Sequence, residues 1–360
     1  MRRLNPRRPT PARMDAWTVG HRVRFLARIV ALLLVLAALP AAHDWLRATT
    51  FTADVVFRLP GRPITWFTGD PSTHTFDYAE GGRGVLTLPA GDGEVPGLIV
   101  ALGADPAEAD DERVVRFTEG LARIGFAVLL TQSDELDGAV VLPVEIDRLA
   151  AAFDALAAHP RVRSDRVGYV GLSAGGSLTI VAASQPDVAG RVAFVVAIGP
   201  YYDAASLAAS VLSQSFRGPE GVEDWDPARI SERAVTNTLL ASLGEEGRVA
   251  FEALAEGATI EEAEAFLDGL GPVPRANLEG VSPSSHIDGL RAPLYLLHDR
   301  ADAFVPWVES EALAADHEPA LYHRLDLFDH VEPQPGNVRH AARDGWRMLR
   351  LLAHILGEFG

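Results

Sequence analysis

The chain has 360 residues, 48% of them hydrophobic, so it is long enough to bury a large core in one large domain or two smaller ones. It contains no cysteine and no lysine, which excludes thiol nucleophiles, disulfides, a Ser-Lys dyad and a phosphate-loop lysine. Its net charge of -17 argues against nucleic-acid binding, because an acidic surface repels phosphate.

The charge is unevenly distributed along the chain. Residues 1–28 form a basic arm with eight arginines and one aspartate, a net charge of +7, which leaves -24 for the remainder. An apolar stretch, 29–46, follows this arm. By the positive-inside rule we predict a signal anchor that holds the protein on the membrane, with the body outside the cytoplasm. A cleaved signal peptide, which would release a secreted protein, and a buried helix of the globular domain are the alternatives.

From about residue 50, strand patterns alternate with helix patterns. Segments 76–78 and 84–89 predict a hairpin, and the apolar runs 97–102 and 125–130 are typical of strands buried in a parallel sheet. Further along the chain we predict strands at 167–172, 193–198, 293–298 and 322–328, and helices at 144–158, 174–184 and 338–358. This alternation predicts an α/β fold with a doubly wound, mostly parallel sheet, its core formed by residues 50–200 and 288–360.

Two features of the later chain refine this prediction. The last helix, 338–358, is expected to turn Trp346, Leu349, Leu352 and Ile355 toward the sheet. Residues 201–287 contain no convincing strand and several acidic helical patches, which predicts a helical cap inserted between two strands. Open α/β sheets bind ligands at the carboxyl edge, so a cap there would shape the pocket and exclude water. A surface excursion that does not contact the site is the alternative.

The sequence GLSAG at 171–175 matches the G-x-S-x-G motif at a junction of strand, turn and helix. So sharp a turn leaves no room for side chains near Ser173, and Gly171, Gly175 and Gly176 remove them. The serine hydroxyl is then raised above the sheet edge beside a helix N-terminus, which favours negative charge. We therefore predict that Ser173 is a nucleophile.

Such a serine needs a base, and without lysine this base must be a histidine. In this kind of fold an acid and then a histidine follow the serine, each in a loop after a late strand. His330, after the strand 322–328, meets that condition and is the predicted base. The remaining candidates lie inside a strand, too early in the chain, or in or beside helices: His323, His298, His159, His340 and His354.

The acid is expected in the loop HDRADAFVP, after the strand 293–298. Asp302 lies further into this loop than Asp299, which abuts the strand, so Asp302 is favoured as the group that orients the imidazole. An oxyanion also needs donors. One is the backbone N–H of Ala174, and the second is expected from Gly103 or Ala104, after the strand 97–102. No metal or organic cofactor is implied.

Together these residues resemble the α/β-hydrolase family, in particular its branch of dienelactone hydrolases, acyl-peptide peptidases and esterases. The matching motifs follow the family's order between residues 73 and 332: THTFDYAEGGRGVLTLPAGDGEVPGLIVALGA, SDRVGYVGLSAGGSL, SPSSHIDGLRAPLYLLHDRADAFVP and LFDHVEP. Two positions depart from the family. Asp299 stands where glycine is usual, and the loop after the strand 97–102 reads Gly-Ala-Asp instead of His-Gly.

The resemblance implies that Ser173, Asp302 and His330 form a triad. Such a triad would cleave an ester, thioester or amide bond of a small-molecule or peptide substrate through an acyl-enzyme. An acyltransferase with the same triad is one alternative. A non-catalytic binding protein of the same fold is the other, although binding alone would not require these three side chains together.

Overall fold

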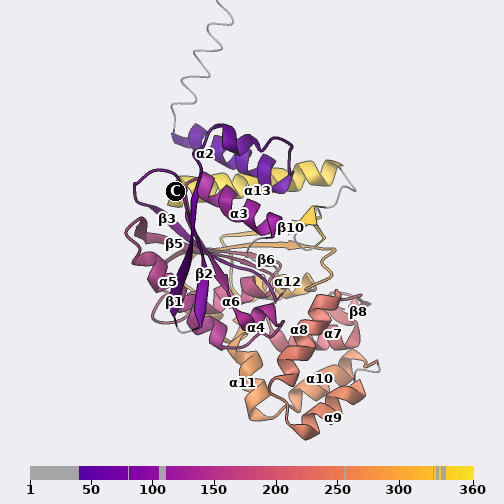
Figure 1. Ribbon diagram of the computed structural model, residues 1–360. Coiled ribbons are helices and arrows are strands. Elements are labelled where there is room, and N and C mark those ends of the chain that lie inside the picture. Colours follow the sequence, from indigo (N-terminus) through magenta and orange to yellow (C-terminus); the bar gives the residue numbers. More distant parts are fainter. Residues whose placement is uncertain are drawn as a thin grey trace, which may run out of the picture.

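The central element of the fold is a twisted sheet of eight strands (Figure 1). A computed structural model describes residues 40–79, 81–104, 111–254, 257–326, 328–329, 332–333 and 338–360. The strand order is β1-β2-β4-β3-β5-β6-β9-β10. The strands are β1 (Ser72–Ala79), β2 (Gly82–Leu88), β3 (Val95–Ala101), β4 (Ala127–Gln132), β5 (Val162–Leu172), β6 (Val192–Ile198), β9 (Leu294–Asp299) and β10 (Leu321–Leu325). β2 pairs antiparallel with β1 and β4, and the other neighbours pair in parallel.

The inner strands of the sheet are apolar along most of their length. All six residues of β9 are buried, and β3 has a single residue that is partly exposed. A strand covered on both faces must be apolar on both, so continuous apolar runs replace the alternation of a half-exposed strand. The predicted doubly wound, mostly parallel sheet is confirmed.

Helices cover both faces of the sheet and bury a separate apolar core on each side (Figure 1). On one face lie α5 (Val144–Ala157) and α6 (Ala174–Ala183), and on the other lie α2 (Pro40–Phe51), α3 (Glu112–Arg123) and α13 (Val338–Phe359). Tyr169 of β5 shows how the first core closes. Its ring stacks on Phe153 of α5, and its hydroxyl donates a 2.9 Å hydrogen bond to the carbonyl of Leu149.

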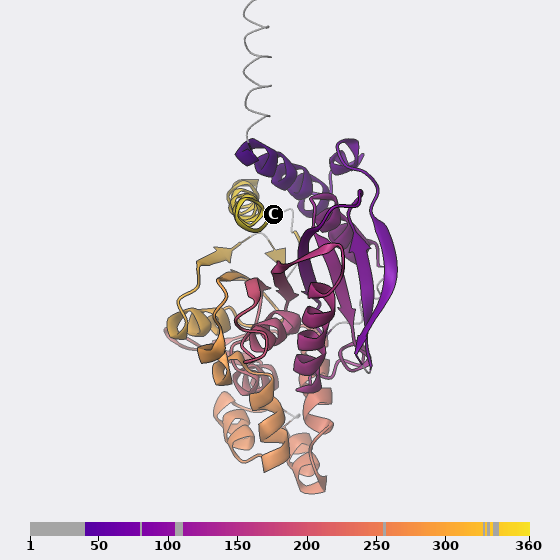
Figure 2. The ribbon, with the colours of Figure 1, turned by 90° about the vertical axis from the view of Figure 1, so that its left-hand side faces the viewer.

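The segment 201–287 forms a helical lobe at the opposite end of the molecule from α2 and α13 (Figures 1 and 2). Its helices are α7 (Ala204–Ser213), α8 (Arg229–Leu240), α9 (Glu245–Leu254), α10 (Ile260–Asp268) and α11 (Pro272–Gly280). The prediction that this segment contains no strand was wrong, because β7 (Ser215–Gly218) and β8 (Gly221–Asp224) pair as a hairpin. Its strands are four residues long and β8 carries no buried residue, so the sequence shows no apolar strand pattern.

Two predictions about the C-terminal part need correction. β10 ends at Leu325 and does not continue to residue 328, because the N–H of Asp326 donates to buried Asp344 of α13 at 2.8 Å. Phe328 and Asp329 pair instead with Glu332 and Pro333 in the short strands β11 (Phe328–Asp329) and β12 (Glu332–Pro333). Trp346 does not face the sheet. It is 53% exposed and stacks on Trp45 of α2, an element that the sequence analysis did not predict.

The predicted N-terminal anchor, 29–46, lies mostly outside the described residues. From Pro40 onward it forms α2, which continues to Phe51 and packs against α13. Within the part of the chain that the structure describes, no helix has the length and apolar character needed to span a bilayer.

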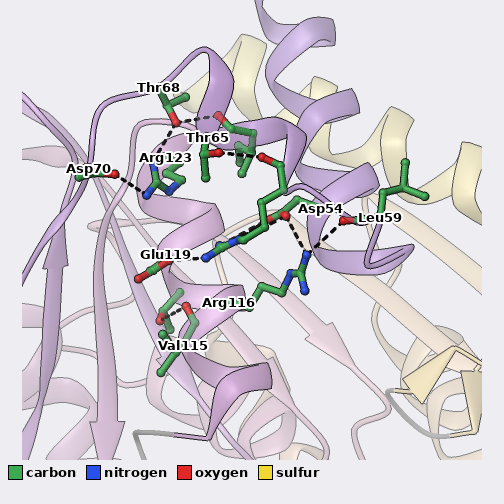
Figure 3. A network of polar contacts seen from close by, with 12 residues as sticks. Asp54, Leu59, Thr65, Thr68, Asp70, Val115, Arg116, Glu119 and Arg123 are labelled. Atoms are coloured by element: carbon green, nitrogen blue, oxygen red, sulfur yellow. Dashed lines mark hydrogen bonds and ion pairs between the residues drawn. The ribbon is translucent and has the colours of Figure 1, made fainter.

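A buried ionic network fixes the turns that follow α2 (Figure 3). α2 continues into a π-helical turn, η1 (Thr52–Val56), and the chain then forms a 3₁₀ turn, η2 (Pro63–Trp66). Asp54 is fully buried and accepts from Arg62 at 3.2 Å and from Arg116 of α3 at 3.0 Å. Arg62 also pairs with Glu119 of α3 at 3.0 Å. The network therefore holds η1 and η2 against α3.

We predict that Asp54→Asn lowers the free energy of unfolding by about 3 kcal/mol, because it leaves two arginines facing a buried amide. Urea denaturation measures the change. The control is Asp154→Asn, which removes the exposed ion pair with Arg191 and should cost less than about 1 kcal/mol. Equal losses in the two variants would mean that the Asp54 network does not stabilise the fold.

Candidate functional site

Ser173 occupies a strained turn between β5 and α6. Its backbone has φ 54° and ψ -129°, in a region that residues with a side chain rarely adopt. The N–H of Ser173 donates to the carbonyl of Ile198 at 2.8 Å, and its own carbonyl accepts from the N–H of Gly176 at 2.8 Å. These bonds to the end of β6 and to the first turn of α6 hold the strained conformation in place.

The glycines around Ser173 permit very close backbone approaches. A Cβ on Gly175 would lie 2.3 Å from the carbonyl oxygens of both Ala101 and Leu102 at the end of β3. A Cβ on Gly171 would lie 2.3 Å from the carbonyl oxygen of Gly175. Real Cβ atoms do not approach backbone oxygens so closely, so α6 can start beside β3 only because both positions lack a side chain.

The three residues predicted as oxyanion donors lie around Ser173. Gly103, which follows β3, is so close that a Cβ there would be 2.9 Å from the Cβ of Ser173 and 3.2 Å from its Oγ. Ala174 is the first residue of α6, and Ala104 follows Gly103. All three line the same cavity as Ser173. The structure therefore brings the ends of β3 and β5 together at the serine.

Both candidate acids are buried: Asp299 is the last residue of β9, and Asp302 lies in the loop that follows. The carboxylate of Asp302 accepts hydrogen bonds from the N–H groups of Phe304 at 2.7 Å and Val305 at 3.1 Å. Asp299 accepts from the N–H of Ala301 at 2.9 Å. Backbone N–H groups thus orient both carboxylates. Both are also buried, so burial alone does not show which one is the acid.

The predicted base, His330, lies outside the described residues, so its assignment stays a prediction. Among the other histidines considered, His298 is fully buried, with its ring nitrogens 2.6 Å from the Ser310 hydroxyl and 3.0 Å from the Val305 carbonyl. Its Nε2 also lies 3.5 Å from Asp302. His323 sits on β10, where burial lowers its pKa.

Ser173 opens into an apolar cavity of about 320 Å³. One wall comes from α7 and α8 of the 201–287 segment, which supply Ala204, Leu207, Ala208, Val235 and Leu239. The other wall comes from η1 and α3, which supply Val55, Val56, Val114 and Phe117. The cavity is therefore built from segments far apart in the sequence, and it would accommodate an apolar group next to the serine hydroxyl.

One buried carboxylate ties the 201–287 segment to the core, and the sequence analysis missed it. Glu309, in the first turn of α12 (Val308–Asp316), accepts from the N–H of Tyr202 at 2.8 Å and of Asp203 at 3.0 Å. It also accepts from the Ser206 hydroxyl at 2.6 Å. Burial raises the pKa of Glu309, and these donors oppose the rise. Glutamate is common in the first turn of helices, so the sequence around Glu309 does not indicate that it binds the 201–287 segment.

The far end of the segment joins the same cluster. The Ser284 hydroxyl donates to Asp203 at 2.7 Å, and the Ser284 N–H donates to the Tyr202 carbonyl at 3.0 Å. Glu309 therefore holds the start of the segment directly and its end through Asp203. Neither here nor elsewhere in the described residues is a group of three or more histidine, aspartate or glutamate side chains arranged to hold a metal ion.

Comparisons with known proteins identify the fold. No family model matches the sequence, and no curated protein matches it. A Pyrococcus horikoshii acylaminoacyl peptidase matches the structure with a TM-score of 0.53 at 15% identity, over 82% of this chain and 44% of that one. The 2,6-dihydroxy-pseudo-oxynicotine hydrolase gives 0.50 at 17% identity, over 81% and 70%. A Mycobacterium tuberculosis puromycin-hydrolyzing peptidase gives 0.50 at 17%, over 80% and 39%.

The chain has the α/β-hydrolase fold. It spans less than half the length of the two peptidases. In an α/β-hydrolase the nucleophile occupies a sharp turn between a strand and a helix, where Ser173 lies here.

We predict that Gly175→Ala destabilises this α/β-hydrolase fold by about 3 kcal/mol or more, because the added methyl group meets two backbone carbonyls that cannot move aside. Thermal or urea unfolding measures the effect. Gly244→Ala is the control, since a Cβ there meets nothing within 4 Å. A Gly175→Ala variant as stable as this control would show that the contact between the start of α6 and the end of β3 has room for a side chain.

Proposed function

We propose that the protein is a serine hydrolase in which Ser173 attacks an ester, thioester or amide carbonyl. The observation that carries the proposal is the strained backbone of Ser173 at the N-terminus of α6. Ser173 also lines an apolar cavity of about 320 Å³. Strain of this kind is maintained at functional sites and has no benefit for packing alone. Structures with the same fold include proteins named as a hydrolase and as peptidases, which agrees with this class of reaction.

In the proposed reaction His330 takes the proton from the Ser173 hydroxyl as its oxygen bonds to the carbonyl carbon. The carbonyl oxygen then carries a negative charge. The first N–H groups of an α-helix have no intrahelical acceptor, so the N–H of Ala174 is free to donate to this oxyanion. Gly103 or Ala104 supplies the second donor from the end of β3.

Collapse of this intermediate breaks the bond to the alcohol, thiol or amine, which takes the proton from His330 and departs. A water molecule, deprotonated by His330, then bonds to the acyl carbon. The bond to the Ser173 oxygen breaks, this oxygen takes the proton back from His330, and the acid departs. Asp302 is the proposed partner of His330, holding the ring in the tautomer that accepts the serine proton. Two backbone N–H groups hold its carboxylate in place.

The apolar walls of the cavity favour a substrate with an apolar acyl group, because apolar surface transferred from water stabilises the complex. We also propose that the part of the predicted anchor 29–46 that precedes α2 holds the protein on the membrane, with this site outside the cytoplasm. The basic arm before the apolar run supports that orientation.

We expect a fluorophosphonate probe to label the full-length protein on Ser173, because an activated serine attacks the probe's phosphorus. Mass spectrometry of the digested protein locates the adduct. Ser173→Ala and His330→Ala should both abolish labelling while leaving the unfolding curve unchanged. A folded wild-type protein that forms no adduct would contradict the proposal and favour a non-catalytic binding protein of the same fold.

We expect Asp302→Asn to lower kcat toward a short soluble ester by about 100-fold or more, because the imidazole loses its orienting charge. Asp299→Asn is the matched control, a buried aspartate three residues earlier at the end of β9, and should change kcat by less than about fivefold. Circular dichroism checks that both variants fold. The opposite ranking would assign the acid to Asp299.

A further inference from the structure

Exposed apolar side chains gather at one end of the molecule. Of the large hydrophobic side chains that are exposed in the described residues, those outside this end are four valines, on β8, α5, α9 and α11. The rest, including every exposed aromatic side chain, belong to α2, α13 and the chain around η1 and η2. We call this surface the aromatic face, and it comprises Trp45, Leu46, Phe57, Leu59, Trp66, Phe67 and Trp346.

The elements that carry the aromatic face pack against one another. Trp45 of α2 stacks on Trp346 of α13 with ring centroids 5.4 Å apart. Phe57 lies against α13, since a Cβ on Gly345 would be 2.6 Å from its ring. α2 and α13 lie next to one another at the end of the molecule opposite the helical lobe (Figures 1 and 2), and η1 and η2 pack against α2.

Trp66 and Phe67 are the most exposed members of the aromatic face, with 68% and 69% of their surface exposed. Exposing two neighbouring aromatic rings to water is unfavourable, and such patches on soluble proteins mark sites of interaction. The network of Asp54, Arg62 and Arg116 fixes η1 and η2, which ends at Trp66, on α3 (Figure 3). The face is therefore held in shape before any partner binds.

The cavity at Ser173 reaches the surface beside this face. Among its described lining residues, Arg58 and Arg113 are exposed. Arg58 stands between two members of the aromatic face, Phe57 and Leu59. Its φ of 46° is unfavourable for a residue with a side chain, so this turn is held by its surroundings.

The sequence of the residues that precede Pro40 indicates what covers the aromatic face. Residues 29–39 are almost entirely apolar and lead directly into α2, which carries Trp45. Tryptophan and other aromatic side chains are enriched where a protein meets the boundary between lipid and water. A bilayer that receives residues 29–39 would lie next to the aromatic face.

We propose that the aromatic face docks on the surface of a lipid bilayer and turns toward it the side of the cavity that Arg58 lines. Substrate would then enter from the lipid, as an ester whose apolar acyl chain passes directly into the cavity. This second part rests on the proposed hydrolase function. The docking itself does not, because it depends on the exposed rings and not on Ser173.

The docking is tested by tryptophan fluorescence of the full-length protein reconstituted into phosphatidylcholine vesicles that contain brominated acyl chains. Bromine quenches only rings that reach the lipid. We expect Trp66→Phe to lose part of the quenchable emission, and Trp307→Phe, which removes a partly buried ring that packs against Phe216 of the lobe, to lose none. If Trp66→Phe leaves the quenchable emission unchanged, Trp66 does not reach lipid. Burial of the face by residues 1–39 or by a second copy of the chain would give this result and overturn the proposal.

The delivery of substrate is tested with the variant Trp66→Ser/Phe67→Ser. Its rate on a long-chain ester held in phosphatidylcholine vesicles should fall by at least about tenfold, because two apolar anchors are lost. Its rate on a soluble short-chain ester should stay within about twofold of wild type, since neither ring lines the cavity. Val249→Ser/Val273→Ser, which alters exposed valines on the lobe, should change neither rate.

The outcomes separate the two proposals. A uniform loss on both esters, or equal effects of the two double variants on the vesicle-held ester, would overturn delivery from the bilayer. If the wild-type protein hydrolyses no soluble ester and takes no fluorophosphonate label, the hydrolase function fails. The quenching of Trp66 still decides whether the face docks on lipid.

Discussion

The turn at Ser173 is the constraint around which the site is arranged. α6 starts against the last carbonyls of β3, and the absence of a side chain at Gly175 is what makes this approach sterically feasible. The approach brings the end of β3, the helix N-terminus and the serine into one small volume. The strained φ of Ser173 persists because the end of β6 and the first turn of α6 both bond its backbone.

The cavity next to Ser173 has two walls, and a buried carboxylate holds each of them in place. Glu309 holds both ends of the lobe that supplies α7 and α8, and Asp54 holds the turn η1 against α3. A buried carboxylate surrounded by donors is costly to separate from them, so such contacts fix the arrangement of segments more than they add to stability. The size and shape of the apolar space therefore depend on polar contacts outside it.

The turn η1 has two roles in this arrangement. Val55 and Val56 line the cavity, while Phe57 and Leu59, just beyond the turn, belong to the exposed aromatic face. A single short segment thus connects the interior at Ser173 with the surface that we infer to meet lipid. Any movement of η1 would alter both the cavity wall and the aromatic face, and the ionic network of Asp54 opposes such movement.

The sequence by itself determined the sheet and the turn at Ser173. Apolar runs, and glycines spaced around a serine, are patterns of neighbouring residues that short-range sterics and burial impose directly. It also predicted the loop that carries Asp302, because the order of the strands fixes which loops meet at the carboxyl edge. His330 stays a prediction from that same order.

Only the tertiary structure decided the contacts between remote segments. Trp346 turns away from the sheet because α2 packs beside α13, and no pattern within residues 338–358 indicates that partner. The roles of Asp54 and Glu309 depend on donors that other helices and turns bring to them. The cavity and the aromatic face arise in the same way, since each exists only where chain segments distant in sequence come together.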